Sequence, residues 1–168
     1  TKLATIAIAD HIGPVYLRFG RPKVPNFTSE NFDFKIGKGI MLKEGKDVTI
    51  VSTGHLVWES LEASKKLEEI GISSEIINIH TIKPLDEEII ISSVKKTNAI
   101  VSAEEHNYLG GLGESVSRTL STNYPVPQEF IATNDTFGES GTPFELMKKY
   151  GLDSDSIVES VKKVISRK

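Results

Sequence analysis

Short apolar runs alternate with amphipathic segments between Asp47 and Gly113, and this alternation constrains the fold more than any other feature. The runs Val48–Val51, Glu75–Ile79 and Ala99–Ala103 are rich in β-branched residues, and segments of helical periodicity separate them. Strands buried on both faces read as such continuous runs, and their alternation with helices is typical of βαβ units. The pattern therefore predicts an α/β fold with a parallel sheet.

Polar residues stand where each of these apolar runs ends. They are Thr53-Gly54, His80-Thr81 and Glu104-Glu105-His106. Ligands of open α/β sheets usually bind beyond the carboxyl ends of the strands. We therefore expect any chemistry to lie along this one edge of the sheet.

Further elements extend the pattern on both sides. We expect helices over residues 1–12, 56–70, 110–120, 143–150 and 154–165, another that begins at Asp86, and strands over 15–19 and 128–132. Residues 36–42 and 48–52 favour a β-hairpin, because only Lys43-Glu44-Gly45-Lys46 separates them. Residues 22–33 lack periodicity and hold two prolines, which is typical of a linker. These features predict an arm and linker over residues 1–33 and a compact domain over residues 34–168.

The composition is that of an ordinary globular protein, with 38% hydrophobic and 26% charged residues. A net charge of -3 gives no electrostatic reason to expect binding to nucleic acid or to an anionic membrane. Without cysteine, the chain can form neither a disulfide nor a thiolate zinc site. We expect a cytoplasmic protein. Because the sequence starts without Met and inside a helical segment, we also expect a piece of a longer protein.

Three glycines, Gly110, Gly111 and Gly113, precede a predicted helix and allow two interpretations. Backbone N–H groups at such a helix start could bind a phosphate. Alternatively, small residues could let the helix approach the sheet or a neighbouring subunit closely. No Walker motif follows, so the packing interpretation is favoured.

The acidic pair Glu104-Glu105 beside His106 could perform acid–base chemistry or hold a metal. Neighbouring residues of a strand point to opposite faces, however, which favours an interface or hydrogen-bonding role. The other histidines, at positions 11, 55 and 80, have no metal-site spacing. Glu139-Ser140-Gly141 reads as a turn, and no nucleophile-elbow motif occurs. The sequence therefore predicts neither a catalytic residue nor a metal site in this chain.

Arg18 and Arg21 flank Gly20 at the end of the arm. A guanidinium at a strand end can grip an anion through two hydrogen bonds, and it can equally form a surface salt bridge. The spacing alone leaves both roles open.

Three separated motifs resemble one known family. The arm GPVYLRFGRPKVP is similar to the end of the pyrimidine-binding domain of thiamine-diphosphate enzymes of the transketolase group. The segment from VTIVSTGHLVWES to IKPLD, with SAEEHNYLGGLGE, resembles the C-terminal domain of that group. FGESGTPFELMKKYGL resembles the closing segment of transketolase itself, and this favours transketolase over deoxyxylulose-phosphate synthase and the beta chain of 2-oxo-acid dehydrogenases.

The resemblance implies a fold and a reaction. The fold is a three-layer α/β domain whose five-stranded sheet is mostly parallel, with one antiparallel strand. The reaction transfers a two-carbon ketol unit between sugar phosphates through thiamine diphosphate and a divalent cation, Mg or Ca. The cofactor sites belong to earlier parts of the family's chain, so no cofactor is expected on this chain alone.

The resemblance also implies partners and one site residue. The expected partners are an N-terminal transketolase section, a second copy in a homodimer with the Glu105–Gly113 corner near the contact, and sugar phosphates. Only Arg21 matches a family position, the arginine that grips the substrate phosphate. Its neighbours here are Gly20 and Pro22, where transketolases often have Ser and Gln. A second hypothesis is a regulatory module that binds a small anion with Thr53, His80 and Glu105.

Overall fold

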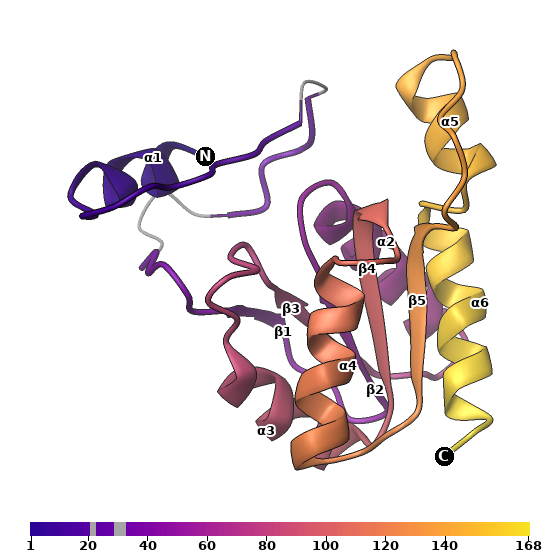
Figure 1. Cartoon of the computed structure of the whole chain (residues 1–168). Helices are drawn as coiled ribbons and strands as arrows, with labels where there is room; N and C mark the ends of the chain where they lie inside the picture. Colours follow the sequence, from indigo (N-terminus) through magenta and orange to yellow (C-terminus); the bar gives the residue numbers. More distant parts are fainter. Residues whose placement is uncertain (21–22, 29–32) are drawn as a thin grey trace.

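The computed structural model describes residues 1–20, 23–28 and 33–168. It contains a three-layer α/β domain, with an N-terminal arm above one edge of the sheet (Figure 1). The strands are β1 (Ile40–Lys43), β2 (Val48–Ser52), β3 (Ser74–Asn78), β4 (Ile100–Asn107) and β5 (Gln128–Thr133). The helices are α1 (Lys2–Ala9), α2 (Leu56–Glu69), α3 (Glu87–Thr97), α4 (Leu112–Asn123), α5 (Pro143–Lys149) and α6 (Ser154–Ile165).

The sheet has the order β1-β3-β2-β4-β5. All neighbouring strands run parallel except β1, which is antiparallel to β3. This confirms the predicted fold class of a mostly parallel five-stranded sheet with one antiparallel strand.

Two apolar cores lie on the two faces of the sheet because alternate strand residues point to opposite sides. Ile50 and Val101 face the core beneath α2 and α6, whereas Val51 and Ile100 face the core beneath α3 and α4. Every residue of β2 and β3 is buried, as expected for central strands covered on both faces.

The helix ends agree with their sequence signals. Asp86 caps α3, accepting a hydrogen bond from the Ile89 amide at 3.4 Å. Thr142 and Glu145 form a reciprocal capping box at the start of α5. No helix in the part of the chain that the structure describes is long and apolar enough to cross a membrane.

Two predicted elements of the N-terminal half are wrong. The expected hairpin does not form, because β3 lies between β1 and β2 and takes the pairing with β1. The expected strand over residues 15–19 forms no ladder with any described strand. A strand requires a sheet edge as partner, and this segment instead lies above the ends of the strands (Figure 1).

Candidate functional site

The candidate site lies at the carboxyl ends of β2 and β4, a position that we call the crevice by analogy with other open α/β sheets. β2 leads into α2 on one face of the sheet, and β4 leads into α4 on the other face. The connections of these two neighbouring strands therefore diverge, which makes the crevice a topological switch point of the kind where α/β proteins bind ligands. The strand ends are held together there by the Thr53 amide, which donates to the Ala103 carbonyl at 3.1 Å.

Gly54 turns the chain from β2 into α2 with a φ of +59°. A side chain would be strained in this left-handed conformation. The turn places His55 just beyond the strand, at the N-terminal end of α2. His55 belongs to neither of the two apolar cores.

His55 and Glu105 meet across the crevice. The His55 Nδ1 lies 3.2 Å from the Glu105 Oε2. The His55 side chain is 16% exposed and that of Glu105 is 45% exposed. The pair therefore joins the end of β4 to the start of α2 at a half-buried position.

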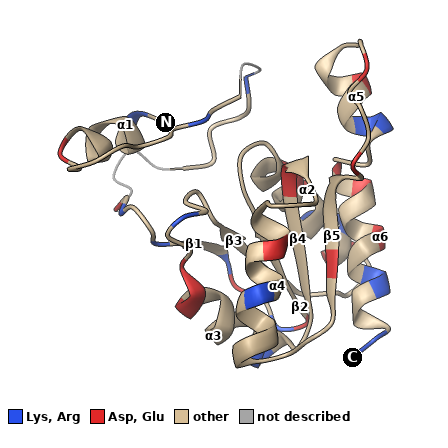
Figure 2. Ribbon diagram, in the orientation of Figure 1, with Lys and Arg blue, Asp and Glu red and all other residues tan. Residues whose placement is uncertain are grey.

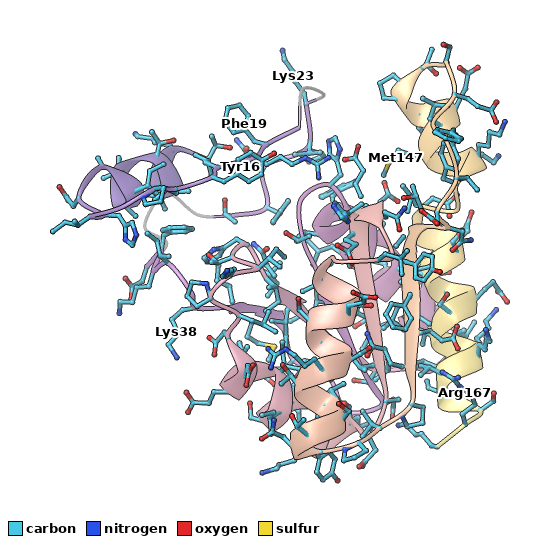
Figure 3. All side chains as sticks on the ribbon, viewed as in Figure 1. Tyr16, Phe19, Lys23, Lys38, Met147 and Arg167 are labelled. Carbon is cyan, nitrogen blue, oxygen red and sulfur yellow. The ribbon has the colours of Figure 1, made fainter. Side chains whose placement is uncertain are left out.

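The N-terminal arm occupies the same crevice. Arg18 Nη1 donates to the backbone carbonyl of Glu105 at 3.3 Å. Gly20 packs so close to His55 that a Cβ at position 20 would lie 3.3 Å from the imidazole Cε1. Figure 3 shows the arm with Tyr16 and Phe19 labelled, on the side towards which β4 points. Among the described residues Arg18 forms no ion pair and contacts a backbone carbonyl instead, while its anion-binding role stays a prediction.

Glu104 points the opposite way from Glu105, as the alternation of strand residues predicts. Its side chain is buried at 3% exposure. One carboxylate oxygen accepts from the Leu112 amide and the other from the Gly113 amide, each at 2.8 Å. The carboxylate therefore occupies the N-terminus of α4, where opposite partial charge stabilises it.

This arrangement contradicts the phosphate-loop interpretation of the glycine-rich turn. The amides that would bind a phosphate already bind Glu104, and the Gly110 amide donates to Glu114 at 2.8 Å. The glycines instead permit close packing within the chain. A Cβ at Gly111 would collide with the Glu104 carboxylate, and one at Gly113 would collide with the Phe130 ring.

His80 lies just beyond the end of β3. Its ring stacks on Phe34 with centroids 4.3 Å apart, and its Nδ1 lies 2.8 Å from the Thr81 hydroxyl. Burial lowers the pKa of His80 because it penalises the charged imidazolium. These contacts do not test the hypothesis of an anion site at Thr53, His80 and Glu105, which stays a prediction.

A surface hollow of about 560 Å³ lies beside the β3–α3 turn. Its lining includes Lys83, Gly110, Ser115 and Arg118. Arg118 of α4 donates to Glu87 of α3 at 2.7 Å, and the basic and acidic segments of these helices can be followed in Figure 2. The guanidinium charge of Arg118 is thus balanced by a carboxylate that also lines the hollow.

Arg21, the residue expected to bind the substrate phosphate, lies outside the described residues. Across residues 1–20, 23–28 and 33–168, no group of three or more metal-ligating side chains gathers in one place.

Sequence reasoning missed the two contacts that define the crevice. Gly20 and His55 are 35 positions apart, and Arg18 and Glu105 are 87 apart. No local pattern signals such pairings. The sequence does single out Glu104, but its role as the cap of α4 depends on how closely that helix meets β4.

Comparison with known proteins gives a consistent result. A family model described as "Transketolase, C-terminal domain" matches residues 37–157. The chain is 43% identical to the 6-deoxy-6-sulfo-D-fructose transketolase subunit SqwH of Clostridium sp., over 96% of this chain and 50% of that protein. It is 35% identical to one of the subunits of the apulose-4-phosphate transketolase of Phocaeicola vulgatus, over 99% of this chain and 54% of that protein.

A solved structure extends this similarity to three dimensions. It is described as "Split gene transketolase, inactive beta4 tetramer" and is 45% identical, with a TM-score of 0.92. The match covers 95% of this chain and 52% of the solved chain. The chain thus spans about half the length of these relatives.

Proposed function

Because the chain belongs to the transketolase C-terminal domain family, we propose that it is the C-terminal section of a transketolase. The complete enzyme would transfer a two-carbon ketol unit between sugar phosphates. The observation that carries this proposal is the match to a split-gene transketolase over 95% of the chain, with 45% identity. A match of that extent includes more than the domain that the family model covers.

The cofactor would be held by another section of the enzyme. Among the described residues no three carboxylate, imidazole or thiolate side chains gather in one place, so this part of the chain offers no such cluster for the divalent cation of the cofactor. The N-terminus of α4, the obvious place for a diphosphate, is filled by Glu104. An N-terminal transketolase section is therefore the partner that this chain requires for activity.

The contribution of this chain to substrate binding would be Arg21. A guanidinium recognises a phosphate through two charge-assisted hydrogen bonds. Two relatives are named for substrates with an anionic group, a sulfonate in one and a phosphate in the other. These names support an anion-binding role for the arm that carries Arg21.

The assembly would also contain a second copy of this chain. A relative of 45% identity is described as a tetramer of its beta chain. Sedimentation of the complex between this chain and the N-terminal section should give a mass that corresponds to two copies of each. A mass of one copy of each would contradict the proposed homodimer.

The first test of the proposed function is reconstitution. The purified chain alone should show no ketol transfer, and addition of the N-terminal section with thiamine diphosphate and Mg²⁺ should produce it. A control mixture omits the cofactor. Transfer by the chain alone, or no transfer by the complete mixture, would contradict the proposal.

The second test concerns Arg21. In the reconstituted enzyme, Arg21→Ala should raise KM for phosphorylated substrates roughly ten- to hundredfold, because a hydrogen bond to a charged group contributes about 1.5–3 kcal/mol. KM for an unphosphorylated acceptor should change little. Arg118→Ala removes an arginine on α4 and serves as the control. Equal losses for both substrate types would assign Arg21 a structural role.

A further inference from the structure

The crevice between β2 and β4 is the position at which sheets of this type usually bind a ligand, and here it receives the chain's own arm. We infer that His55 and Glu105 are positioning residues that seat the arm in this crevice. In doing so they fix the backbone at Gly20, the residue directly before Arg21. This role for His55 and Glu105 rests on the proposed function of Arg21.

Glu105 contacts the arm and orients its other partner. Its backbone carbonyl accepts the hydrogen bond from Arg18 at 3.3 Å. Its side chain lies 3.2 Å from the His55 Nδ1 and so fixes the plane of the imidazole ring. A single residue at the end of β4 thus links both sides of the seat.

His55 forms the wall against which Gly20 rests. All three imidazole atoms that approach position 20 lie between 3.3 and 3.9 Å from where a Cβ would stand. Even a Cβ there would require the ring or the arm to shift by a few tenths of an ångström, and a larger side chain would require more. Gly20 is therefore matched to His55 by size, and the ring is held in place by Glu105.

The pair joins three segments that are far apart in sequence: the arm, the start of α2 and the end of β4.

The first experiment measures whether the arm is seated, without any use of activity. Trypsin can cleave after Arg18, and cleavage of the native chain follows how often this segment opens. His55→Ala should accelerate cleavage at Arg18–Phe19 roughly tenfold, as expected for the loss of a contact of about 1.4 kcal/mol. Glu105→Ala keeps the carbonyl that Arg18 contacts and removes only the support of the imidazole ring, so it should accelerate cleavage by a smaller factor. Glu105→Gln keeps an acceptor oxygen for the imidazole and should restore most of the protection.

The matched control is His106→Gln, which alters the exposed imidazole next to Glu105. His106 Nδ1 contacts the Asn107 carbonyl at 2.7 Å and does not touch the arm. Trypsin should cleave the His106→Gln variant at Arg18–Phe19 at the same rate as the native chain. Unchanged cleavage in both His55→Ala and Glu105→Ala would overturn the inference.

A pair of substitutions that enlarges residue 20 and shrinks residue 55 tests whether the two residues pack together, even if His55→Ala alone folds poorly. Gly20→Leu should unseat the arm and accelerate cleavage at Arg18–Phe19. The double variant Gly20→Leu with His55→Ala creates space for the leucine and should bring the rate back towards the native value. Independent, additive effects of the two substitutions would show that the residues do not pack together.

A second readout links the seat to phosphate binding in the reconstituted enzyme. His55→Ala should raise KM for phosphorylated substrates about three- to tenfold at unchanged kcat, and Glu105→Gln should do so less. If cleavage accelerates while KM stays unchanged, the arm is seated by these residues but does not position a phosphate contact, and the positioning role is overturned. If Arg21→Ala also leaves phosphate discrimination intact, the proposed function of Arg21 fails separately.

Discussion

Glu104 decides what the glycine-rich turn before α4 can do. Its carboxylate supplies the negative charge and the two acceptor oxygens that a bound phosphate would otherwise provide. The turn therefore has the composition of an anion-binding loop but contains its own anion. The preference for packing over phosphate binding was correct, and the structure adds the reason.

Removal of this carboxylate should destabilise the domain. Glu104→Ala leaves the amides of Leu112 and Gly113 buried without acceptors, at about 1–3 kcal/mol each. We expect the free energy of unfolding in urea to fall by about 2–6 kcal/mol. Glu105→Ala, at the neighbouring exposed position, should change it by less than about 1 kcal/mol. Equal effects of the two variants would show that the cap is not the cause.

His80 makes stability depend on pH near neutrality. Burial lowers its pKa in the folded state below the ordinary value of about 6.5, so below that pH the unfolded chain binds more protons than the folded chain. The contribution of His80 to stability is therefore complete above about pH 6.5 and decreases as the pH falls. His80→Gln should reduce the drop in melting temperature between pH 7.5 and 5.5, whereas His106→Gln should not. Equal drops in all three proteins would contradict this role.

At the level of secondary structure, the sequence is informative where the pattern is local. The apolar runs of β2, β3 and β4 and the starts of α3 and α5 were all predicted, because they depend on residues a few positions apart. The strand that pairs with β1 was not predicted correctly. A short connection between two strands favours a hairpin, but the order of the sheet is set by packing of the two cores over the whole domain.

The position of β1 can be tested by cross-linking, since the chain has no native cysteine. Ile40 of β1 and Asn78 of β3 are directly paired, at a separation that a disulfide can span. Ile40→Cys with Asn78→Cys should therefore form a disulfide under oxidation. Ile40→Cys with Ser52→Cys should not, because Ser52 lies on β2, one strand further away. Disulfide formation is measured from the gel mobility of the denatured protein. A disulfide between positions 40 and 52, and none between positions 40 and 78, would support the hairpin instead.

For the molecule as a whole, the arm and the domain have separate roles. No described residue before Val48 belongs to the buried core. A chain that begins at Phe34 keeps both cores and the stack on His80. Folding and the seat for the arm are thus properties of the domain, while the proposed phosphate contact belongs to the arm.

Deletion of residues 1–33 should leave the domain folded. We expect a cooperative urea transition whose unfolding free energy lies within about 1 kcal/mol of that of the full chain, because no core contact is lost. The same truncation should abolish ketol transfer in the reconstituted enzyme. A truncated chain without a cooperative transition, observed by circular dichroism, would show that the arm is part of the folding unit.

Because both carboxylate oxygens of Glu104 bind backbone amides, a small carboxylate from solution could replace this side chain when it is removed. In Glu104→Ala, the two amides at the start of α4 face a space that a carboxylate has left. Formate has the same two oxygens and should bind there, which would raise the melting temperature of the variant in proportion to the logarithm of the formate concentration. The native chain should not respond, and chloride at equal ionic strength should rescue neither. A glutamate that evolved as an internal part would then be replaceable by a solute.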